Sequence, residues 1–149
     1  MFSVACRRLR KCCFVLYTDI FLKNDKMAND LLKGKRGVIF GALDEQSIAW
    51  KVAERCHEEG ASLTLTNAPV ALRFGKIQEL AEKIGAEVIG ADATSLEDLE
   101  KLFDQSTEIL GGKLDFVLHS IGMSLNVRKK REYTNLKYDW MHKTFDISA

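Results

Sequence analysis

The residues best placed to do chemistry follow a short apolar run at residues 38–40. Gly41 comes directly after this run, and Ser47 and Ile48 follow six and seven positions later. A glycine lets a ligand approach the main chain, while a hydroxyl and an N–H group at the start of a helix point toward phosphate oxygens. This spacing predicts a site for the pyrophosphate of a dinucleotide. Because the G-x-G-x-x-G fingerprint is absent, plain α/β scaffolding is the alternative.

Two further groups of candidate residues stand at the ends of predicted strands. The Asp92 carboxylate can accept a hydrogen bond from an adenine amino group, and the Ala93 N–H can donate to the ring. Ser120, Ile121 and Gly122 follow another strand, where Gly122 permits close approach of the main chain to a ribose. Ligands of open α/β sheets bind outside the carboxyl ends of the strands. The alternatives are that Asp92 caps the next helix and that Gly122 is only a turn residue.

The choice of nucleotide is left open by the residues after the second predicted strand. Residues 66–69 contain no Asp or Glu that could accept a hydrogen bond from the ribose hydroxyl, so NADH and NADPH are both candidates. Arg73 either meets a 2′-phosphate or is solvated. His57, His119 and His142 are scattered without ligand spacing, which predicts no metal site, and no catalytic residue is identified.

Composition and charge are those of an ordinary globular domain of 149 residues, 46% hydrophobic and 29% charged. Residues 1–26 hold six Lys/Arg against two Asp, whereas the remainder holds sixteen against nineteen Asp/Glu. A mildly acidic body argues against nucleic acid as a partner. The Arg-Lys-Lys-Arg run at 128–131 is predicted as a loop that is either simply solvated or attracts an acidic carrier domain. Only Cys56 lies outside the leader, so we expect neither a disulfide framework nor a cysteine metal site, as in a reducing compartment.

Residues 1–26 form a basic, cysteine-rich leader that we expect to lie outside the fold. Its apolar patch at residues 12–22 superficially resembles a secretory signal, but Asp19 interrupts it and its length falls short of the ~20 residues that span a bilayer. The preferred interpretation is a translated upstream extension, with Met27 as the natural start. A membrane or organelle-targeting role is the alternative. The expected boundaries are therefore 1–26 for the leader and 27–149 for the first part of a dinucleotide-binding domain, with no membrane partner.

Strand-like and helix-like segments alternate along this body. Apolar residues at 48, 49, 52, 53 and 56 recur at helical spacing, and the run at 38–40 is typical of a buried parallel strand. The predicted strands are residues 37–40, 62–66, 87–91 and 114–119, and the predicted helices are 47–59, 70–84, 96–110 and a last one beginning near 135. This alternation predicts an α/β fold: a Rossmann-type doubly wound parallel sheet, truncated after the fourth strand.

Several of these motifs together resemble those of a known family, from about Leu31 to the end of the sequence. They are Gly41 with Ser-Ile-Ala at 47–49, Asp-Ala at 92–93, His-Ser-Ile-Gly at 119–122 and Phe-Asp-Ile-Ser at 145–148. In this combination the sequence is similar to the enoyl-acyl carrier protein reductases of bacterial fatty-acid synthesis, a branch of the short-chain dehydrogenase/reductase superfamily. The glycine with Ser-Ile-Ala and the His-Ser-Ile-Gly motif are more specific to this branch than a generic Rossmann pattern.

The resemblance implies a cytoplasmic homotetramer that passes hydride from NADH, or from NADPH, to the double bond of a trans-2-enoyl thioester. The thioester would be carried by acyl carrier protein. Together with the strand-end argument, the resemblance also assigns roles to residues of this sequence. The expected cofactor contacts are Gly41, Ser47, Ile48, Asp92, Ala93, Ser120, Ile121 and Gly122, with Ser124 at the acyl entrance.

The sequence departs from the family pattern at two points. Ala68 stands where many members place a glutamine near the adenosine ribose. The family's chemistry also uses a tyrosine followed, after six intervening residues, by a lysine: the phenol stabilises the developing enolate, and the lysine holds the ribose. Here Trp140 stands seven positions beyond Tyr133, and Phe145 stands seven beyond Tyr138.

We therefore interpret the chain as the cofactor-binding half of such a reductase, from a truncated gene product or a partial reading frame, that does not turn over by itself. One alternative is a non-catalytic module that senses nicotinamide nucleotides. The other is a different doubly wound enzyme, such as another short-chain reductase or a methyltransferase that uses S-adenosylmethionine. A methyltransferase is disfavoured because it usually has an acid after the second strand, where Asn67 stands here.

Overall fold

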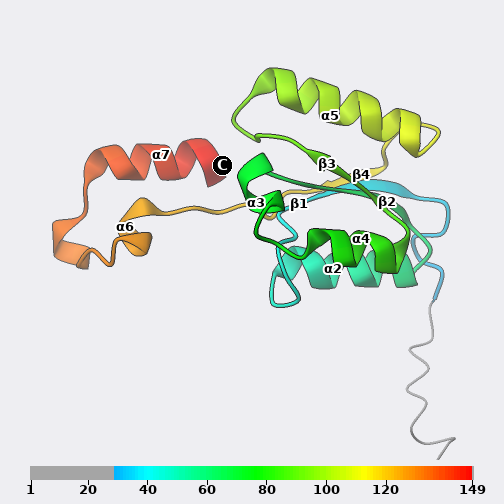
Figure 1. Ribbon diagram of the computed structural model, residues 1–149, viewed down its shortest axis with the longest axis horizontal. Coiled ribbons are helices and arrows are strands. Elements are labelled where there is room, and N and C mark those ends of the chain that lie inside the picture. Colours follow the sequence, from blue (N-terminus) through cyan, green and yellow to red (C-terminus); the bar gives the residue numbers. More distant parts are fainter. Residues whose placement is uncertain (1–28, 149) are drawn as a thin grey trace, which may run out of the picture.

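The computed structural model describes residues 29–148, and the expectations for the leader at 1–26 lie outside this range. Its centre is a sheet of four strands in the order β3-β2-β1-β4, in which every neighbouring pair is parallel (Figure 1). The strands are β1 (Arg36–Phe40), β2 (Ser62–Asn67), β3 (Glu87–Gly90) and β4 (Phe116–Leu118). The predicted doubly wound α/β architecture is therefore confirmed.

Helices cover both faces of the sheet, as Figure 1 shows. They are α2 (Ile48–Glu58) and α4 (Ile77–Ile84) on one face and α5 (Leu96–Ile109) on the other. The continuous apolar run of β1 suits this position, because it sends Ile39 to the α2 and α4 side and Val38 and Phe40 to the α5 side. Val38 and Ile39 are completely buried.

Strand β2 has one apolar and one polar face, as its alternation predicts. Leu63 and Leu65 join the core beneath α2 and α4, so Thr64 and Thr66 face the other layer. The hydroxyl of Thr64 donates a hydrogen bond to the Ser106 hydroxyl of α5 at 3.0 Å, and both residues are fully buried. A hydrogen bond therefore links the sheet to α5 inside an otherwise apolar layer.

The prediction of one helix over residues 70–84 is wrong, because two helices occupy this region. The first is α3 (Pro69–Leu72), and α4 begins only at Ile77. Between them the main-chain N–H of Lys76 donates to the Leu43 carbonyl at 2.8 Å, and a Cβ on Gly75 would lie 2.9 Å from that same oxygen. The chain leaves the helical path here in order to pack against the loop that follows β1.

The fourth strand is shorter than the predicted 114–119, since β4 covers only three residues. The preceding residue, Asp115, is bound to the start of β1 instead. Its carboxylate accepts from the Lys35 ammonium at 2.8 Å and from the Arg36 N–H at 2.9 Å, and its own N–H donates to the Arg36 carbonyl. These contacts hold the pKa of Asp115 below its ordinary value, the hydrogen bond from Lys35 being the main cause.

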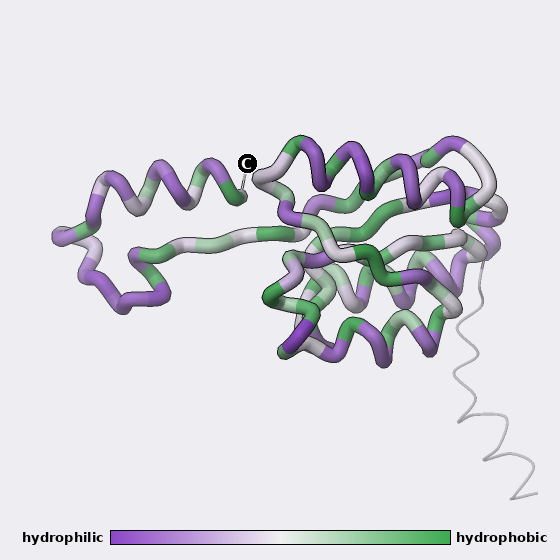
Figure 2. Tube along the Cα trace, turned by 45° about the horizontal axis from the view of Figure 1, so that its top comes forward, coloured by the Kyte–Doolittle hydropathy of each residue, from purple (hydrophilic) through white to green (hydrophobic). Residues whose placement is uncertain are grey.

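After β4 the chain forms an arm that extends beyond the sheet and folds back toward it (Figures 1 and 2). The arm contains α6 (Leu125–Arg128), a 3-10 turn η1 (Tyr133–Asn135) and α7 (Tyr138–Ser148). Its two ends meet where the Met123 N–H donates to the Ser148 hydroxyl at 3.1 Å. The predicted loop at 128–131 thus begins with the last residue of α6, and the helix expected near 135 begins three residues later. Figure 2 shows the bend between α6 and α7 as strongly hydrophilic.

Candidate functional site

A cavity of about 460 Å³ lies at the carboxyl ends of β1, β2 and β4. This is where the strand order reverses, because β2 and β4 lie on opposite sides of β1. Open α/β sheets bind their ligands at such a switch point. The lining residues are Gly41, Leu43, Asn67, Ala68, Ala71, Ser120, Ile121, Gly122, Met123, Ser124, Val127, Arg128 and Ile147. We call this cavity the switch-point crevice.

Five of the nine residues singled out from the sequence line this crevice, and they come from the ends of β1 and β4. They are Gly41, Ser120, Ile121, Gly122 and Ser124. The other four, Ser47, Ile48, Asp92 and Ala93, do not line it. The role of eight of these residues in cofactor binding, and of Ser124 at the acyl entrance, stays a prediction.

Gly41 has a structural reason to be glycine apart from any ligand. Its φ of 89° lies in the left-handed region, and a Cβ there would collide with the main-chain carbonyl of Ser120. Gly122 is different, since a Cβ would meet nothing within 4 Å. Gly41 therefore permits contact between the loops after β1 and β4, while Gly122 borders open space in the crevice.

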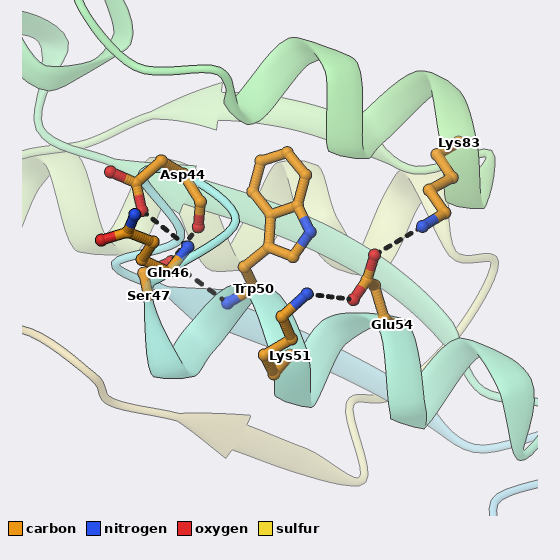
Figure 3. A network of polar contacts seen from close by, with 7 residues as sticks. All are labelled: Asp44, Gln46, Ser47, Trp50, Lys51, Glu54 and Lys83. Atoms are coloured by element: carbon orange, nitrogen blue, oxygen red, sulfur yellow. Dashed lines mark hydrogen bonds and ion pairs between the residues drawn. The ribbon is translucent and has the colours of Figure 1, made fainter.

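Ser47 begins α2, and local bonds occupy its hydroxyl (Figure 3). The Oγ atom donates to the Asp44 carbonyl at 2.7 Å and accepts from the N–H groups of Trp50 at 3.4 Å and Leu43 at 3.3 Å. These bonds shape residues 43–47 into a compact turn. The N–H groups of Ile48 and Ala49, at the first two positions of the helix, have no acceptor within the helix and remain the groups suited to an anion.

The same helix is tied to α4 by a buried tryptophan and an ion pair (Figure 3). Trp50 is 3% exposed, and Glu54, one turn later, accepts from the Lys83 ammonium at 2.6 Å and from Lys51 at 3.2 Å. The hydrogen bond from Lys83 is the largest of the effects that lower the pKa of Glu54 to about 2; Trp50 and Lys51 contribute further. This network fixes α2, whose start borders the loop after β1.

Asp92 and Ala93 follow β3, which is two strands away from β1. Asp92 is exposed, and its carboxylate accepts from the N–H and the hydroxyl of Thr94 at 2.9 and 2.8 Å. The main-chain bond from Thr94 is the first cause of the lowered pKa of Asp92. The cap of α5 is Ser95, so the alternative role for Asp92 as the helix cap is wrong. Ala93 packs against the core beneath α5, as Ile121 also does.

Sequence reasoning did not place the other lining residues at the crevice, although it discussed Asn67, Ala68 and the segments that contain Arg128 and Ile147. Asn67 was considered only as a missing acid; its side chain donates to the Ala42 carbonyl at 3.2 Å and accepts from the Ala68 N–H at 2.9 Å, which shapes the end of β2. Ile147 reaches the crevice only because the arm folds back, and no local sequence signal indicates such a return. Among the described residues that line the crevice, Arg128 is the only charged one, and none is a carboxylate.

A second cavity, of about 320 Å³, lies within the arm between α6 and α7. It shares Ser124 and Val127 with the switch-point crevice, so the two cavities adjoin. Its remaining lining residues are Asn126, Arg131, Tyr133, Leu136, Met141, Thr144 and Phe145. We call it the arm cavity. Ser124 stands at the junction, where its hydroxyl accepts from the Val127 N–H at 3.4 Å and caps α6.

Neither a metal centre nor a membrane-spanning helix is found among residues 29–148. No three His, Cys, Asp or Glu side chains gather as a metal site would require in this part of the chain. Within the same range, none of the helices has the length and apolar character needed to cross a bilayer. Cys56 is a free thiol on α2, and burial raises its pKa.

Comparison with known proteins decides the family. The model of the family described as "Enoyl-(Acyl carrier protein) reductase" matches residues 41–149, which include the whole switch-point crevice. The chain belongs to the enoyl-acyl carrier protein reductase family. The sequence resemblance is thereby confirmed.

Individual members of this reductase family are also similar to the chain. The enoyl-[acyl-carrier-protein] reductase [NADH] 1 of Rhizobium meliloti is 37% identical over 82% of the chain. A crystal structure of the FabI–NADH complex from Alistipes finegoldii is 64% identical over 80% of the chain, with a TM-score of 0.77. The Bacillus cereus enoyl-acyl carrier protein reductase, solved with NADP+ and indole naphthyridinone, is 30% identical over 80% of the chain, with a TM-score of 0.70.

The chain spans less than half the length of these reductases. It covers 44% of the Rhizobium meliloti protein, 42% of the Alistipes finegoldii chain and 47% of the Bacillus cereus chain.

Proposed function

We propose that this chain forms the nicotinamide-nucleotide site of an enoyl-acyl carrier protein reductase, which reduces a trans-2-enoyl thioester with hydride from NADH. The observation that carries the proposal is the position of the switch-point crevice, at the reversal of strand order in a chain of this family. The relatives' cofactors support it, because the Alistipes finegoldii protein forms a complex with NADH.

The lining suits a dinucleotide. Main chain and mostly small side chains border the space at Gly41, Ser120, Ile121 and Gly122. Of the residues that the structure describes there, the charged one is the cationic Arg128, which suits a diphosphate. We assign these residues, with the N–H groups at the start of α2, to cofactor binding. Ser47 contributes by capping that helix. Asp92 and Ala93 are assigned to the adenine end, and Ser124, at the junction of the two cavities, to the acyl entrance.

When bound, the nicotinamide would supply the hydride, and this chain's residues would bind and orient it. Both loops at the β1 and β4 ends form one wall, because Gly41 packs directly against the Ser120 carbonyl. Ile121, in the loop after β4, is anchored in the core beneath α5, which makes that wall rigid. A rigid wall holds a bound nucleotide in one orientation and so reduces the entropy lost on reaching the reactive geometry.

NADH is the proposed cofactor, with NADPH as the alternative. Among residues 29–148, those that line the crevice beside Asn67 and Ala68 include no carboxylate that would repel a 2′-phosphate. The relatives include an enzyme described as NADH-dependent and one solved with NADP+. Arg73 is exposed at the end of α3 and does not line the crevice, so it gives no direct preference for the phosphate.

Calorimetric titration of the 149-residue chain with NADH and NADPH tests the proposal. Gly122→Leu should abolish binding without loss of stability, because its side chain would enter open space. The matched control is Ser62→Leu, at an exposed position at the amino end of β2, whereas the crevice lies at the carboxyl ends of the strands. Heat of binding that is unchanged in Gly122→Leu, or absent from the well-folded parent chain, would refute this site.

Turnover is a separate question from binding. No tyrosine in this sequence is followed seven positions later by a lysine. We expect the purified 149-residue chain to bind NADH without oxidising it when an enoyl thioester is added. Oxidation of NADH that depends on the thioester would show that other residues of this chain do the chemistry.

The remaining expectations concern the complete enzyme. We propose that it accepts enoyl groups on acyl carrier protein, works in the cytoplasm and assembles as a homotetramer, with neither nucleic acid nor membrane as a partner. In the sheet formed by the described residues, β4 is an edge strand and its Val117 is 49% exposed, so this edge offers a surface for contact with another subunit. Light scattering on the complete enzyme would test the tetramer.

A further inference from the structure

The bend of the arm carries a group of cationic side chains, most of which do not line the switch-point crevice. Arg128, Lys129 and Lys130 are exposed at the end of α6, and Arg131 and Lys137 follow within the arm. We call these five residues the basic bend. The bend follows α6 directly, and in Figure 2 it lies at the end of the arm farthest from the sheet.

Two cations of the basic bend lie over the same aromatic ring. The Arg131 guanidinium lies 5.6 Å from the Trp140 ring centroid, and the Lys137 ammonium lies 4.8 Å from it. Each is attracted to the negative face of the indole. Asn126 secures this arrangement, because its side chain donates to the Lys137 carbonyl at 3.2 Å and accepts from the Lys137 N–H at 3.0 Å.

The charges of the basic bend are not neutralised by the described part of the chain. Within residues 29–148, ion pairs form at Lys33, Lys35, Lys51, Arg55, Lys83 and Lys101. None forms at the five residues of the basic bend in that range, although Glu132 lies next to Arg131 in the sequence. The bend therefore presents a concentrated positive field to an external partner.

The position of the basic bend identifies the kind of partner. Arg131 lines the arm cavity, Arg128 lines the switch-point crevice, and the two cavities adjoin at Ser124 and Val127. A molecule bound to the bend therefore stands directly beside both cavities. We propose that the basic bend docks the acidic face of the protein that carries the thioester substrate, an inference that rests on the proposed function.

Nucleic acid fits this surface less well than an acidic protein. Single strands bind by stacking bases on aromatic rings along an extended basic groove. Here two cations already cover the Trp140 ring. The Tyr138 ring makes an edge contact with the His142 ring, with 4.7 Å between their centroids. The cations are gathered at one bend and do not line an extended groove. The mostly apolar cavity beside the bend is suited to an acyl group and not to a phosphate backbone.

Tryptophan fluorescence provides the test, because the chain has two tryptophans and Trp50 is buried in the core. The 149-residue chain would be titrated with purified acyl carrier protein, an acidic protein, while Trp140 reports. We expect saturable binding that weakens as NaCl is raised. Lys129→Glu with Lys130→Glu should weaken it about tenfold, as expected for opposed charges at an interface. The charge-matched control, Lys101→Glu with Lys113→Glu on and after α5, should leave it unchanged.

The outcomes separate this inference from the proposed function. NADH binding by the Lys129→Glu/Lys130→Glu variant should equal that of the parent, since neither lysine lines the crevice. If NADH binds but the carrier does not, or if both double variants weaken the carrier equally, the docking surface is refuted while the function stands. If NADH fails to bind the folded parent, the function is refuted. If a single-stranded oligonucleotide displaces the carrier with equal or higher affinity, the basic bend is a nucleic-acid surface instead.

Discussion

Gly41 and Ser120 are in such close contact that no side chain fits between the Gly41 Cα and the Ser120 carbonyl. They follow β1 and β4, the two strands between which the sheet order reverses. This contact joins the two loops that form one wall of the crevice. It also connects two motifs, the glycine after β1 and His-Ser-Ile-Gly after β4, that lie far apart in the sequence.

Gly41→Ala should therefore be strongly destabilising. The left-handed φ of 89° costs about 1 kcal/mol for a residue with a Cβ, and the collision with Ser120 should add about 1–3 kcal/mol. Urea denaturation measures the total. Gly111→Ala is the control, because its φ of 70° is also left-handed but a Cβ there meets nothing within 4 Å. Equal losses of unfolding free energy in the two variants would mean that the loops after β1 and β4 can move apart at no energetic cost.

Ser47→Ala tests the role of the helix cap. The variant removes the acceptor for the N–H groups of Trp50 and Leu43, so we expect a loss of about 1 kcal/mol in the free energy of unfolding. Ser47→Asp keeps an acceptor and should recover most of the stability, but its charge next to the start of α2 should weaken NADH binding. Thermal unfolding and calorimetry give the two readouts. A fully stable Ser47→Ala chain would show that the hydroxyl is free for a ligand.

Glu54 should make stability depend on acidity. Its pKa in the folded chain is about 2, below the ordinary value of 4.5, so its contribution is complete above about pH 4.5 and disappears as the pH falls toward 2. Because the Lys83 side chain is 64% exposed, solvent screening reduces this contribution to about 1 kcal/mol. Glu54→Gln should flatten the stability profile between pH 5 and about 2.5 in urea denaturation. Glu82→Gln, at an exposed position of α4, should leave the profile as it is in the parent.

Asn126→Ala should loosen the arm while the sheet stays folded. Asn126 is 4% exposed, and both of its bonds to Lys137 would be lost, at a local cost of about 1–3 kcal/mol. We expect Trp140 fluorescence to change at a lower urea concentration than the circular dichroism of the helices. Asn126→Asp keeps only the acceptor, so its Trp140 transition should fall at a urea concentration between those of the alanine variant and the parent chain. Coincident transitions in the alanine variant would mean that arm and sheet unfold together.

The sequence predicted the sheet well because its signals are local. The apolar run of β1 and the alternation of Leu63, Thr64 and Leu65 in β2 follow directly from which faces are buried. Ser47 was correctly placed at the start of α2. Short-range rules suffice for these features because each depends on residues within one turn or one strand.

The remaining features depend on contacts between distant segments. The break between α3 and α4 arises because Lys76 bonds to Leu43, and nothing within residues 70–84 other than Gly75 indicates it. Ile147 enters the crevice through the fold of the whole arm. The hydroxyl of Ser47 was predicted from sequence to point toward phosphate oxygens, whereas in the structure it caps α2 and bonds to the residues around it. Local patterns therefore located the crevice but not its complete lining.

The bond from the Lys76 N–H to the Leu43 carbonyl makes the turn between α3 and α4 a sensor for the loop after β1. Deuterium uptake at that single amide can occur only when the loop moves away from it. A nucleotide that steadies residues 41–47 should thus slow isotope exchange at a position that does not line the crevice itself. Lys76 would then report occupancy from outside the site, with no label on the ligand.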